Sequence, residues 1–221
     1  MADRCLLYYI TDRTAFSGDE PTRRRLLLEK IREAAVAGID YIQLREKDLS
    51  TRDLESLARE AVKIMAELRT SLLINSRTDV ALAVGADGVH LRSDDVYPQE
   101  ASAVWQRHHE CGAGAPACAN SPRDPVIAVS CHSPAEVLQA AASAVTFAVF
   151  APVFEKKGSK PAGLSILHEA CVANIPVLAL GGITLTSAPS CLEAGSAGIA
   201  AIRLFQDNNI AEVVKQLCPN L

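Results

Sequence analysis

Short apolar segments alternate with segments of helical periodicity along most of the chain. Leu27, Ile31 and Ala34 recur at i, i+4 and i+7 in one helical segment, which we expect over residues 22–37. The apolar segments predict strands at residues 6–10, 41–44, 72–75, 88–91, 126–130, 145–153, 176–180 and 197–202. Strands that alternate with helices in this way pair in parallel through right-handed crossovers.

This alternation is typical of the α/β class. Eight strand–helix units in a chain of 221 residues predict a single closed (β/α)8 TIM barrel, with a doubly wound open sheet as the alternative. We expect one domain over residues 1–221, because no linker separates the units. The segment 107–125 is rich in Gly, Ala, Pro and Ser and is expected to be an irregular surface excursion.

The second predicted strand runs directly into charged residues. Because side chains alternate across a strand, Gln43, Arg45 and Lys47 are expected to point the same way. An amide, a guanidinium and an ammonium on one face form a receptor for an anion with several oxygens. The alternative for this segment alone is a solvated strand end.

Polar residues or glycines also stand where the other strands end. They include Tyr9, Asn75, His90, Ser130, Gly182 and Arg203. In barrels, chemistry takes place where the strands end and the following loops begin, so these positions predict a site for a large polar ligand. A lone histidine in a barrel is more often structural than catalytic, and we expect this of both His90 and His132.

Two anion-binding sites can be separated within this set. The first contains hydroxyl and cationic groups from the ends of the second and sixth strands: Arg45, Lys47, Ser159 and Lys160. The second combines a glycine turn with the end of the last strand: Gly182, Ile202 and Arg203. Loops after the seventh and eighth strands are the usual phosphate site of barrels. Ordinary tight-turn glycines and a solvated charged loop are the alternatives.

Asp94 and Asp95 form an adjacent acidic pair near the predicted mouth. Carboxylates beside a cationic phosphate site point to Mg²⁺, which prefers oxygen ligands, although one of the two could instead cap a helix. The histidines and cysteines of segment 107–125 match no common zinc spacing.

Composition narrows the range of partners. A net charge of −4 argues against a nucleic-acid surface, and no apolar run is long enough to cross a membrane. The 7 cysteines are scattered, which favours reduced thiols over a disulfide framework. We therefore expect a cytoplasmic protein that binds small phosphorylated substrates, and the sequence leaves a homo-oligomer open.

Several motifs arrive in an order that resembles thiamine phosphate synthase and its thiazole tautomerase relatives. They are YITD at 9–12, QLREK at 43–47, LIN at 73–75, DVALAVGADGVHL at 79–91, VSCHS at 129–133 and ALGGI at 179–183. The resemblance covers nearly the whole chain, and the motifs are specific as a set.

The resemblance implies a transferase in a TIM barrel. It would join hydroxymethylpyrimidine pyrophosphate to a carboxylated or plain thiazole phosphate, through a pyrimidine-methyl cation left by departing pyrophosphate. By resemblance, Arg45 and Lys47 grip the pyrophosphate, Gln43 and Asn75 help to hold this substrate, and Ser130 lies near the reacting centre. The thiazole phosphate would be held by Gly182 and the backbone of Ile202 and Arg203.

The chain departs from the family pattern at the expected Mg²⁺ ligands. The family commonly carries an acid directly after the Asn of the third strand, where this chain has Ser76. Asp95 matches the second metal carboxylate. The loop after the sixth strand also differs from the family's Pro-Thr-x-Thr-Lys, and Ser159 and Lys160 are expected to serve the same pyrophosphate.

The tautomerase branch usually carries a proton-shuttling histidine just after the small residue that ends the sixth strand. This chain has Ala151 and Pro152 there, as in the synthase branch, and proline cannot move a proton. The resemblance therefore favours a synthase. A thiazole phosphate tautomerase and a non-catalytic phosphate-binding barrel remain as alternatives.

Overall fold

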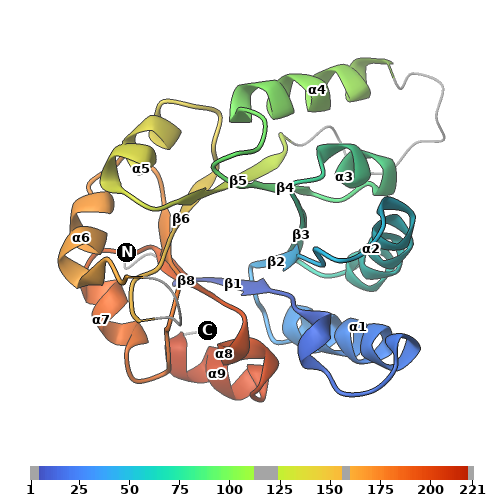
Figure 1. Cartoon of the computed structure of the whole chain (residues 1–221), viewed down its shortest axis with the longest axis horizontal. Coiled ribbons are helices and arrows are strands. Elements are labelled where there is room, and N and C mark those ends of the chain that lie inside the picture. The colour runs from blue at the N-terminus through green and yellow to red at the C-terminus, as the bar shows by residue number, and fades with distance from the viewer. Residues whose placement is uncertain (1–4, 112–123, 156–159, 219–221) are drawn as a thin grey trace.

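The strands close into a barrel. The structure is a computed structural model that describes residues 5–111, 124–155 and 160–218. Each strand pairs in parallel with the next, and β8 pairs with β1, so that the ring in Figure 1 has no free edge. This confirms the predicted (β/α)8 barrel and excludes the open sheet. The strands are β1 (Leu6–Ile10), β2 (Tyr41–Leu44), β3 (Ser71–Asn75), β4 (Gly88–Leu91), β5 (Val126–Cys131), β6 (Phe147–Phe150), β7 (Val177–Ala179) and β8 (Gly198–Ala201).

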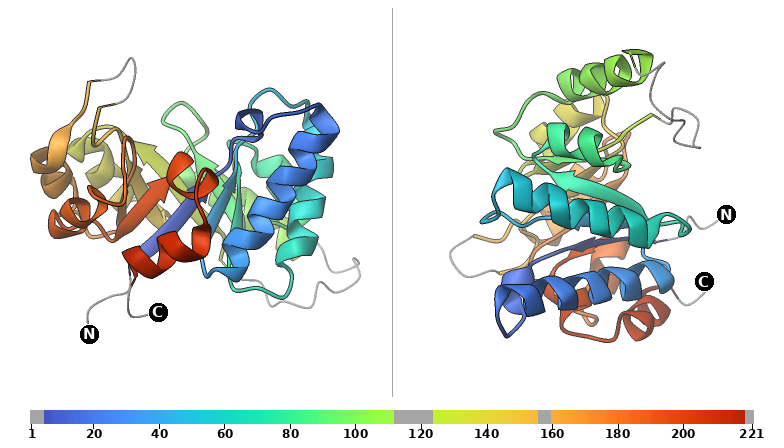
Figure 2. Two further views of the ribbon diagram at one scale, coloured as in Figure 1. Left: turned by 90° about the horizontal axis from the view of Figure 1, so that it is seen from below. Right: turned by 90° about the vertical axis from the view of Figure 1, so that its right-hand side faces the viewer.

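Helices follow the strands and surround the ring. They are α1 (Glu20–Val36), α2 (Thr51–Met65), α3 (Thr78–Val84), α4 (Pro98–Cys111), α5 (Pro134–Ala141), α6 (Gly163–Ala170), α7 (Ala188–Glu193), α8 (Arg203–Gln206) and α9 (Ile210–Leu217). Side-chain caps fix where several begin; the Ser50 hydroxyl, for example, accepts from the Asp53 N–H at 3.2 Å. In the right panel of Figure 2, α1 runs between α2 and the red C-terminal helices, and the Ile210 N–H donates to Glu33 of α1 at 2.8 Å.

Alternation along each strand divides the core into two layers. One layer fills the inside of the ring and includes Tyr8, Leu73, Phe147 and Leu178; the other lies between strands and helices. Tyr9 belongs to the outer layer, where its hydroxyl donates to Gln206 at 3.0 Å. The interpretation of Tyr9 as a residue that lines the mouth of the barrel is therefore wrong. Its neighbour Tyr8 is the side chain that points into the barrel.

Two local predictions need correction. The helix α4 continues to Cys111, so residues 107–111 of the predicted irregular segment are helical, while residues 112–123 lie outside the described part. The strand expected over 145–153 is limited to β6, since Pro152 has no N–H to continue a ladder.

Five cysteines in the described part of the chain are reduced thiols, as expected: Cys5, Cys131, Cys171, Cys191 and Cys218. Among the described residues, no helix is both long enough and apolar enough to span a membrane.

Candidate functional site

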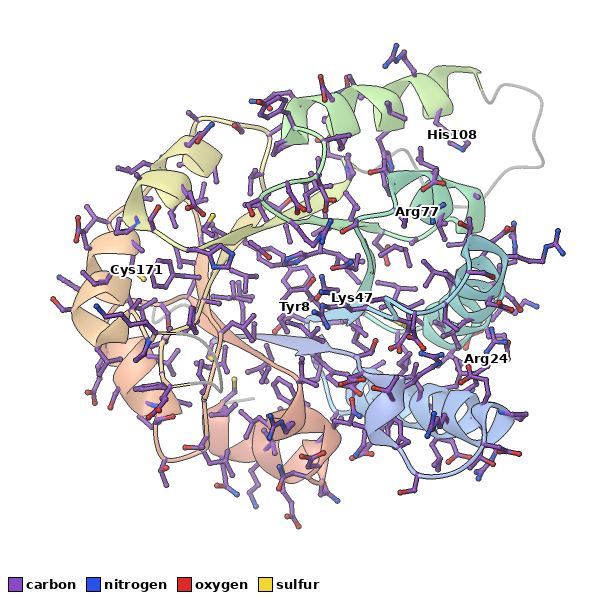
Figure 3. All side chains as sticks on the ribbon, viewed as in Figure 1. Tyr8, Arg24, Lys47, Arg77, His108 and Cys171 are labelled. Atoms are coloured by element: carbon purple, nitrogen blue, oxygen red, sulfur yellow. The ribbon has the colours of Figure 1, made fainter. Side chains whose placement is uncertain are left out.

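A cavity of about 340 Å³ opens where β2, β3 and β4 end. Its walls combine two predicted residues, Lys47 and Asn75, with Ser76, Arg77 and Arg92. Figure 3 shows Lys47 within the ring of strands in projection, near Tyr8. A second groove, of about 520 Å³ between α1 and α2, contains none of the predicted site residues.

A chain of hydrogen bonds crosses the ends of β2 and β3. Gln43, only 2% exposed, donates from its amide to the Asn75 Oδ1 at 3.1 Å. The Asn75 amide in turn donates to the Ser76 Oγ at 3.1 Å. Ser76 holds a left-handed backbone, with φ of 61°, that turns the chain out of the strand. The structure thus brings together Gln43 and Asn75, which the sequence placed in one binding site.

A buried ion pair supports the backbone beneath Arg45. The Arg45 N–H donates to the Thr11 Oγ1 at 3.0 Å, and this hydroxyl donates to Glu46 at 2.6 Å. Glu46 also accepts from the N–H and guanidinium of Arg13, at 3.0 and 3.3 Å. Burial raises the pKa of Glu46, whereas hydrogen bonds from Arg13 lower the pKa of Asp48. The ends of β1 and β2 are therefore fixed to each other.

A second chain of hydrogen bonds crosses the inside of the barrel. The His90 Nδ1 lies 3.0 Å from the Tyr8 hydroxyl, and the His90 Nε2 lies 2.8 Å from the Ser130 Oγ. Burial, aided by the positive charge of Arg45, lowers the pKa of His90 to about 3. The ring is consequently neutral at physiological pH and orients Ser130 as a hydrogen-bonding partner. His132 is exposed, and its Nδ1 donates to the Ala151 carbonyl at 2.7 Å.

The loop after β7 is packed tightly against the loop after β6. Gly181 and Gly182 have φ of 102° and 65°, and the Phe154 N–H donates to the Gly181 carbonyl at 3.1 Å. A Cβ on Gly182 would meet the Glu155 carbonyl oxygen at 2.9 Å, so the close approach itself requires glycine.

The remaining predicted residues lie at or near strand ends. Ile202 occupies the N-cap position of α8, and the exposed Arg203 is its first residue. Lys160 is exposed, and Ser159 lies outside the described residues.

The residues present do not fit a protein-built Mg²⁺ site. The Arg92 N–H and guanidinium donate to the two oxygens of Asp95 at 2.7 and 3.3 Å, and the guanidinium also contacts Asp94 at 3.3 Å. Burial tends to raise the pKa of Asp95, but hydrogen bonds from Arg92 and Ser76 lower it. Among the described residues, no three His, Cys, Asp or Glu side chains are grouped to hold a metal. Asp95 therefore already has a cationic partner.

Sequence reasoning missed several of these groups. Tyr8, Arg13 and Glu46 hold the predicted residues in place through hydrogen bonds. Thr11 and Arg92 stand at strand ends in the sequence, but their roles were not predicted: Thr11 donates to Glu46 and Arg92 lines the cavity. Glu46 lies within the motif at 43–47, but alternation along the strand places its side chain on the face opposite Arg45. That position indicates only that Glu46 is buried.

Together, the closed parallel barrel and a mouth lined with cationic, amide and glycine positions define a class: a TIM barrel suited to phosphorylated ligands. The chain belongs to the thiamine monophosphate synthase family, whose family model matches residues 7–205. This confirms the family to which the motifs pointed.

Individual relatives agree with this membership. The thiamine-phosphate synthase of Clostridium novyi is 31% identical over 220 residues, which cover 97% of each protein. That of Methanoculleus marisnigri is 34% identical over 202 residues, covering 89% of this chain and 85% of the relative. The solved thiamine phosphate pyrophosphorylase from Pyrococcus furiosus superimposes with a TM-score of 0.76 at 27% identity, over 97% of this chain and 94% of that one.

Proposed function

We propose that this chain is a transferase that couples hydroxymethylpyrimidine pyrophosphate to a thiazole phosphate, forming thiamine phosphate and pyrophosphate. The main supporting observation, in a member of this family, is the cavity at the ends of β2, β3 and β4. Lys47 and Asn75 line it, and the buried Gln43 donates a hydrogen bond to Asn75. Small phosphorylated molecules match the cationic and glycine-rich mouth.

The reaction divides into two bond changes. The bond between the pyrimidine methylene carbon and the bridging oxygen breaks, and the oxygen keeps the electron pair as pyrophosphate leaves. The lone pair of the thiazole nitrogen then attacks the resulting cation and forms the new C–N bond. Arg45, which is half-buried, and Lys47, which is exposed, supply the positive charge that stabilises the leaving group as negative charge develops on it.

The other predicted residues bind and orient the substrates. Gln43 and Asn75 hold the pyrimidine pyrophosphate, and Ser130, oriented by His90, lies near the reacting centre. The thiazole phosphate is held by Gly182 and by the backbone at Ile202 and Arg203. Ser159 and Lys160 add to the pyrophosphate site from the loop after β6.

A thiazole tautomerase is less well supported, because Pro152 follows β6 where a proton shuttle would be needed. We retain the predictions of a cytoplasmic protein without a nucleic-acid partner, which the net charge of −4 supports. A homo-oligomer is left open. The predicted binding of Mg²⁺ with Asp95 as a ligand remains a proposal. Because Asp95 is paired with Arg92, an ion that enters with the pyrophosphate substrate fits these residues better than one held by protein carboxylates.

The test is to incubate purified protein with both precursors and Mg²⁺ and to quantify thiamine phosphate and pyrophosphate. We expect equal amounts of the two products. No thiamine phosphate at high protein concentration would overturn the proposal, and aromatisation of the thiazole without coupling would identify an isomerase instead.

Lys47→Ala tests the site within the same assay. We expect at least a tenfold loss of kcat/KM for the pyrophosphate substrate, about the value of one charge-assisted hydrogen bond. Lys63→Ala, an exposed lysine on α2, is the matched control for loss of one positive charge. Equal activity of the two variants would show that Lys47 does not belong to the pyrophosphate site.

A further inference from the structure

Arg92 occupies the space between two positions at which the family resemblance predicted metal ligands. Its Nε donates to the Ser76 Oγ at 3.2 Å, and its Nη2 donates to the Asp95 Oδ1 at 3.3 Å. The guanidinium therefore joins the end of β3 to the loop after β4. It also lines the cavity that contains Lys47 and Asn75.

The arginine is held in place but keeps donor capacity. A guanidinium has five N–H donors, and the contacts described for Arg92 in this part of the chain use Nε and Nη2 but not Nη1. Its side chain is 44% exposed, whereas that of Asp95 is 12% exposed. Nη2 contacts both Asp94 and Asp95, whereas the two N–H groups of Nη1 are suited to donate to oxygens of a phosphate group.

The neutral residue at position 76 makes this arrangement stable. The Ser76 hydroxyl is neutral, so it accepts the hydrogen bond from the Arg92 Nε without compensating the positive charge of the guanidinium. A carboxylate at that position would form a further ion pair with Arg92 and draw the fork away from the cavity. Ser76 and Arg92 thus belong to one arrangement, rather than being two separate losses from a metal site.

We propose that Arg92 binds the pyrophosphate group directly, in the place where relatives of this chain would hold Mg²⁺ on carboxylates. The inference rests on the proposed function for the identity of the anion. Arg92 acts with Arg45 and Lys47 to neutralise the leaving group. Binding of pyrophosphate to this protein consequently depends less on divalent cations than a site built from two acids would.

The test is calorimetric titration of inorganic pyrophosphate into the purified protein in EDTA. We expect measurable binding by the wild type and a loss of roughly tenfold to a hundredfold in affinity for Arg92→Gln. Arg92→Lys, which keeps the charge but not the fork, should give a smaller loss. Arg59→Gln, at an exposed pair with Glu55 on α2, controls for net charge. Thermal unfolding of each variant checks that it is folded.

A double variant tests the opposite arrangement, with two acids and no arginine at this position. Ser76→Asp combined with Arg92→Gln restores an acid beside Asp95 and removes its cation, so pyrophosphate affinity should become strongly dependent on Mg²⁺. Asp tolerates the left-handed backbone of position 76. Undetectable binding by the wild type in EDTA, or affinities within twofold for wild type and Arg92→Gln, would overturn the inference. Because binding is measured without coupling, loss of affinity in a protein that makes no thiamine phosphate would sustain this inference while the proposed function fails.

Discussion

Glu46 is a carboxylate whose side chain is 1% exposed and which accepts three hydrogen bonds from Thr11 and Arg13. Glu46→Gln keeps the shape of the side chain but removes its charge and turns an NH₂ donor toward other donors. We expect the free energy of unfolding to fall by about 2 kcal/mol, measured by urea denaturation.

The matched control is Glu55→Gln, an exposed carboxylate that pairs with Arg59 at 2.7 Å. This substitution should change stability by no more than about 0.5 kcal/mol. Equal effects of the two substitutions would show that the ion pair beneath β1 and β2 does not stabilise the mouth.

His90 predicts a specific dependence of stability on pH. Burial lowers its pKa in the folded protein from 6.5 to about 3, so only the unfolded chain takes up this proton between these values. Stability is therefore lost as the pH falls below 6.5. Between pH 7 and pH 5, His90 alone should remove about 2 kcal/mol of unfolding free energy.

His90→Gln abolishes that part of the decline while still offering a donor and an acceptor to Tyr8 and Ser130. Urea denaturation at both pH values, for the variant and the wild type, measures the difference. The same substitution at exposed His168 of α6 is the control, and an unchanged slope in His90→Gln would contradict a neutral buried ring.

Residues that share a strand face could be predicted from the sequence, whereas their supports could not. Alternation placed Gln43 on the face of β2 opposite Ile42 and Leu44, and the order of strands brought Asn75 beside it. The contact of Tyr8 with His90 spans 82 positions and that of Thr11 with Glu46 spans 35. Such pairings depend on rotamers and register in three dimensions, which a periodic pattern does not specify.

At the scale of elements, all the strands of the barrel could be read from apolar runs bounded by turns, since β strands in barrels are buried on both faces. One helix could not be predicted in the same way. The sequence of α4 is only weakly apolar and runs into segment 107–125 without a break, so the helix was not recognised. Tertiary packing, with Ala101 and Trp105 buried, selects the helix there.

The turn after β7 gives a prediction at this scale. Gly182→Ala must adopt a φ near 65° and also push against Phe154 and the Glu155 carbonyl, at 2.9 Å each. We expect a loss of stability of about 2–4 kcal/mol and a raised KM for the thiazole phosphate, because the two loops separate.

Gly85→Ala isolates the cost of the backbone conformation. Gly85 has a φ of 70°, but an added Cβ would meet nothing within 4 Å. It should therefore lose only about 1–2 kcal/mol and leave the KM unchanged. Urea denaturation and steady-state kinetics measure both effects, and equal losses would mean that loop packing does not shape the site.

Closure of the whole molecule depends on the pairing of β8 with β1. Leu6 and Gly198 are partners in this register, and a Cβ on Gly198 would lie 2.0 Å from the Leu6 carbonyl oxygen. Gly198→Ala cannot be relieved by moving a side chain, so the strands themselves must shift. Since β8 leads directly to Ile202 and Arg203, the same shift reaches the mouth.

We therefore expect Gly198→Ala to lower the free energy of unfolding by about 3 kcal/mol or more, and to weaken binding of the thiazole phosphate. In Gly195→Ala, three residues earlier, the added Cβ would meet only the Cys171 Cβ, at 3.3 Å. This variant measures the cost of the positive φ of 101° without disturbing the pairing of β8 with β1. Urea denaturation and ligand titration compare the two variants. If Gly198→Ala is as stable as Gly195→Ala, the barrel tolerates a shift between β8 and β1. The loops, rather than closure of the sheet, would then position the mouth.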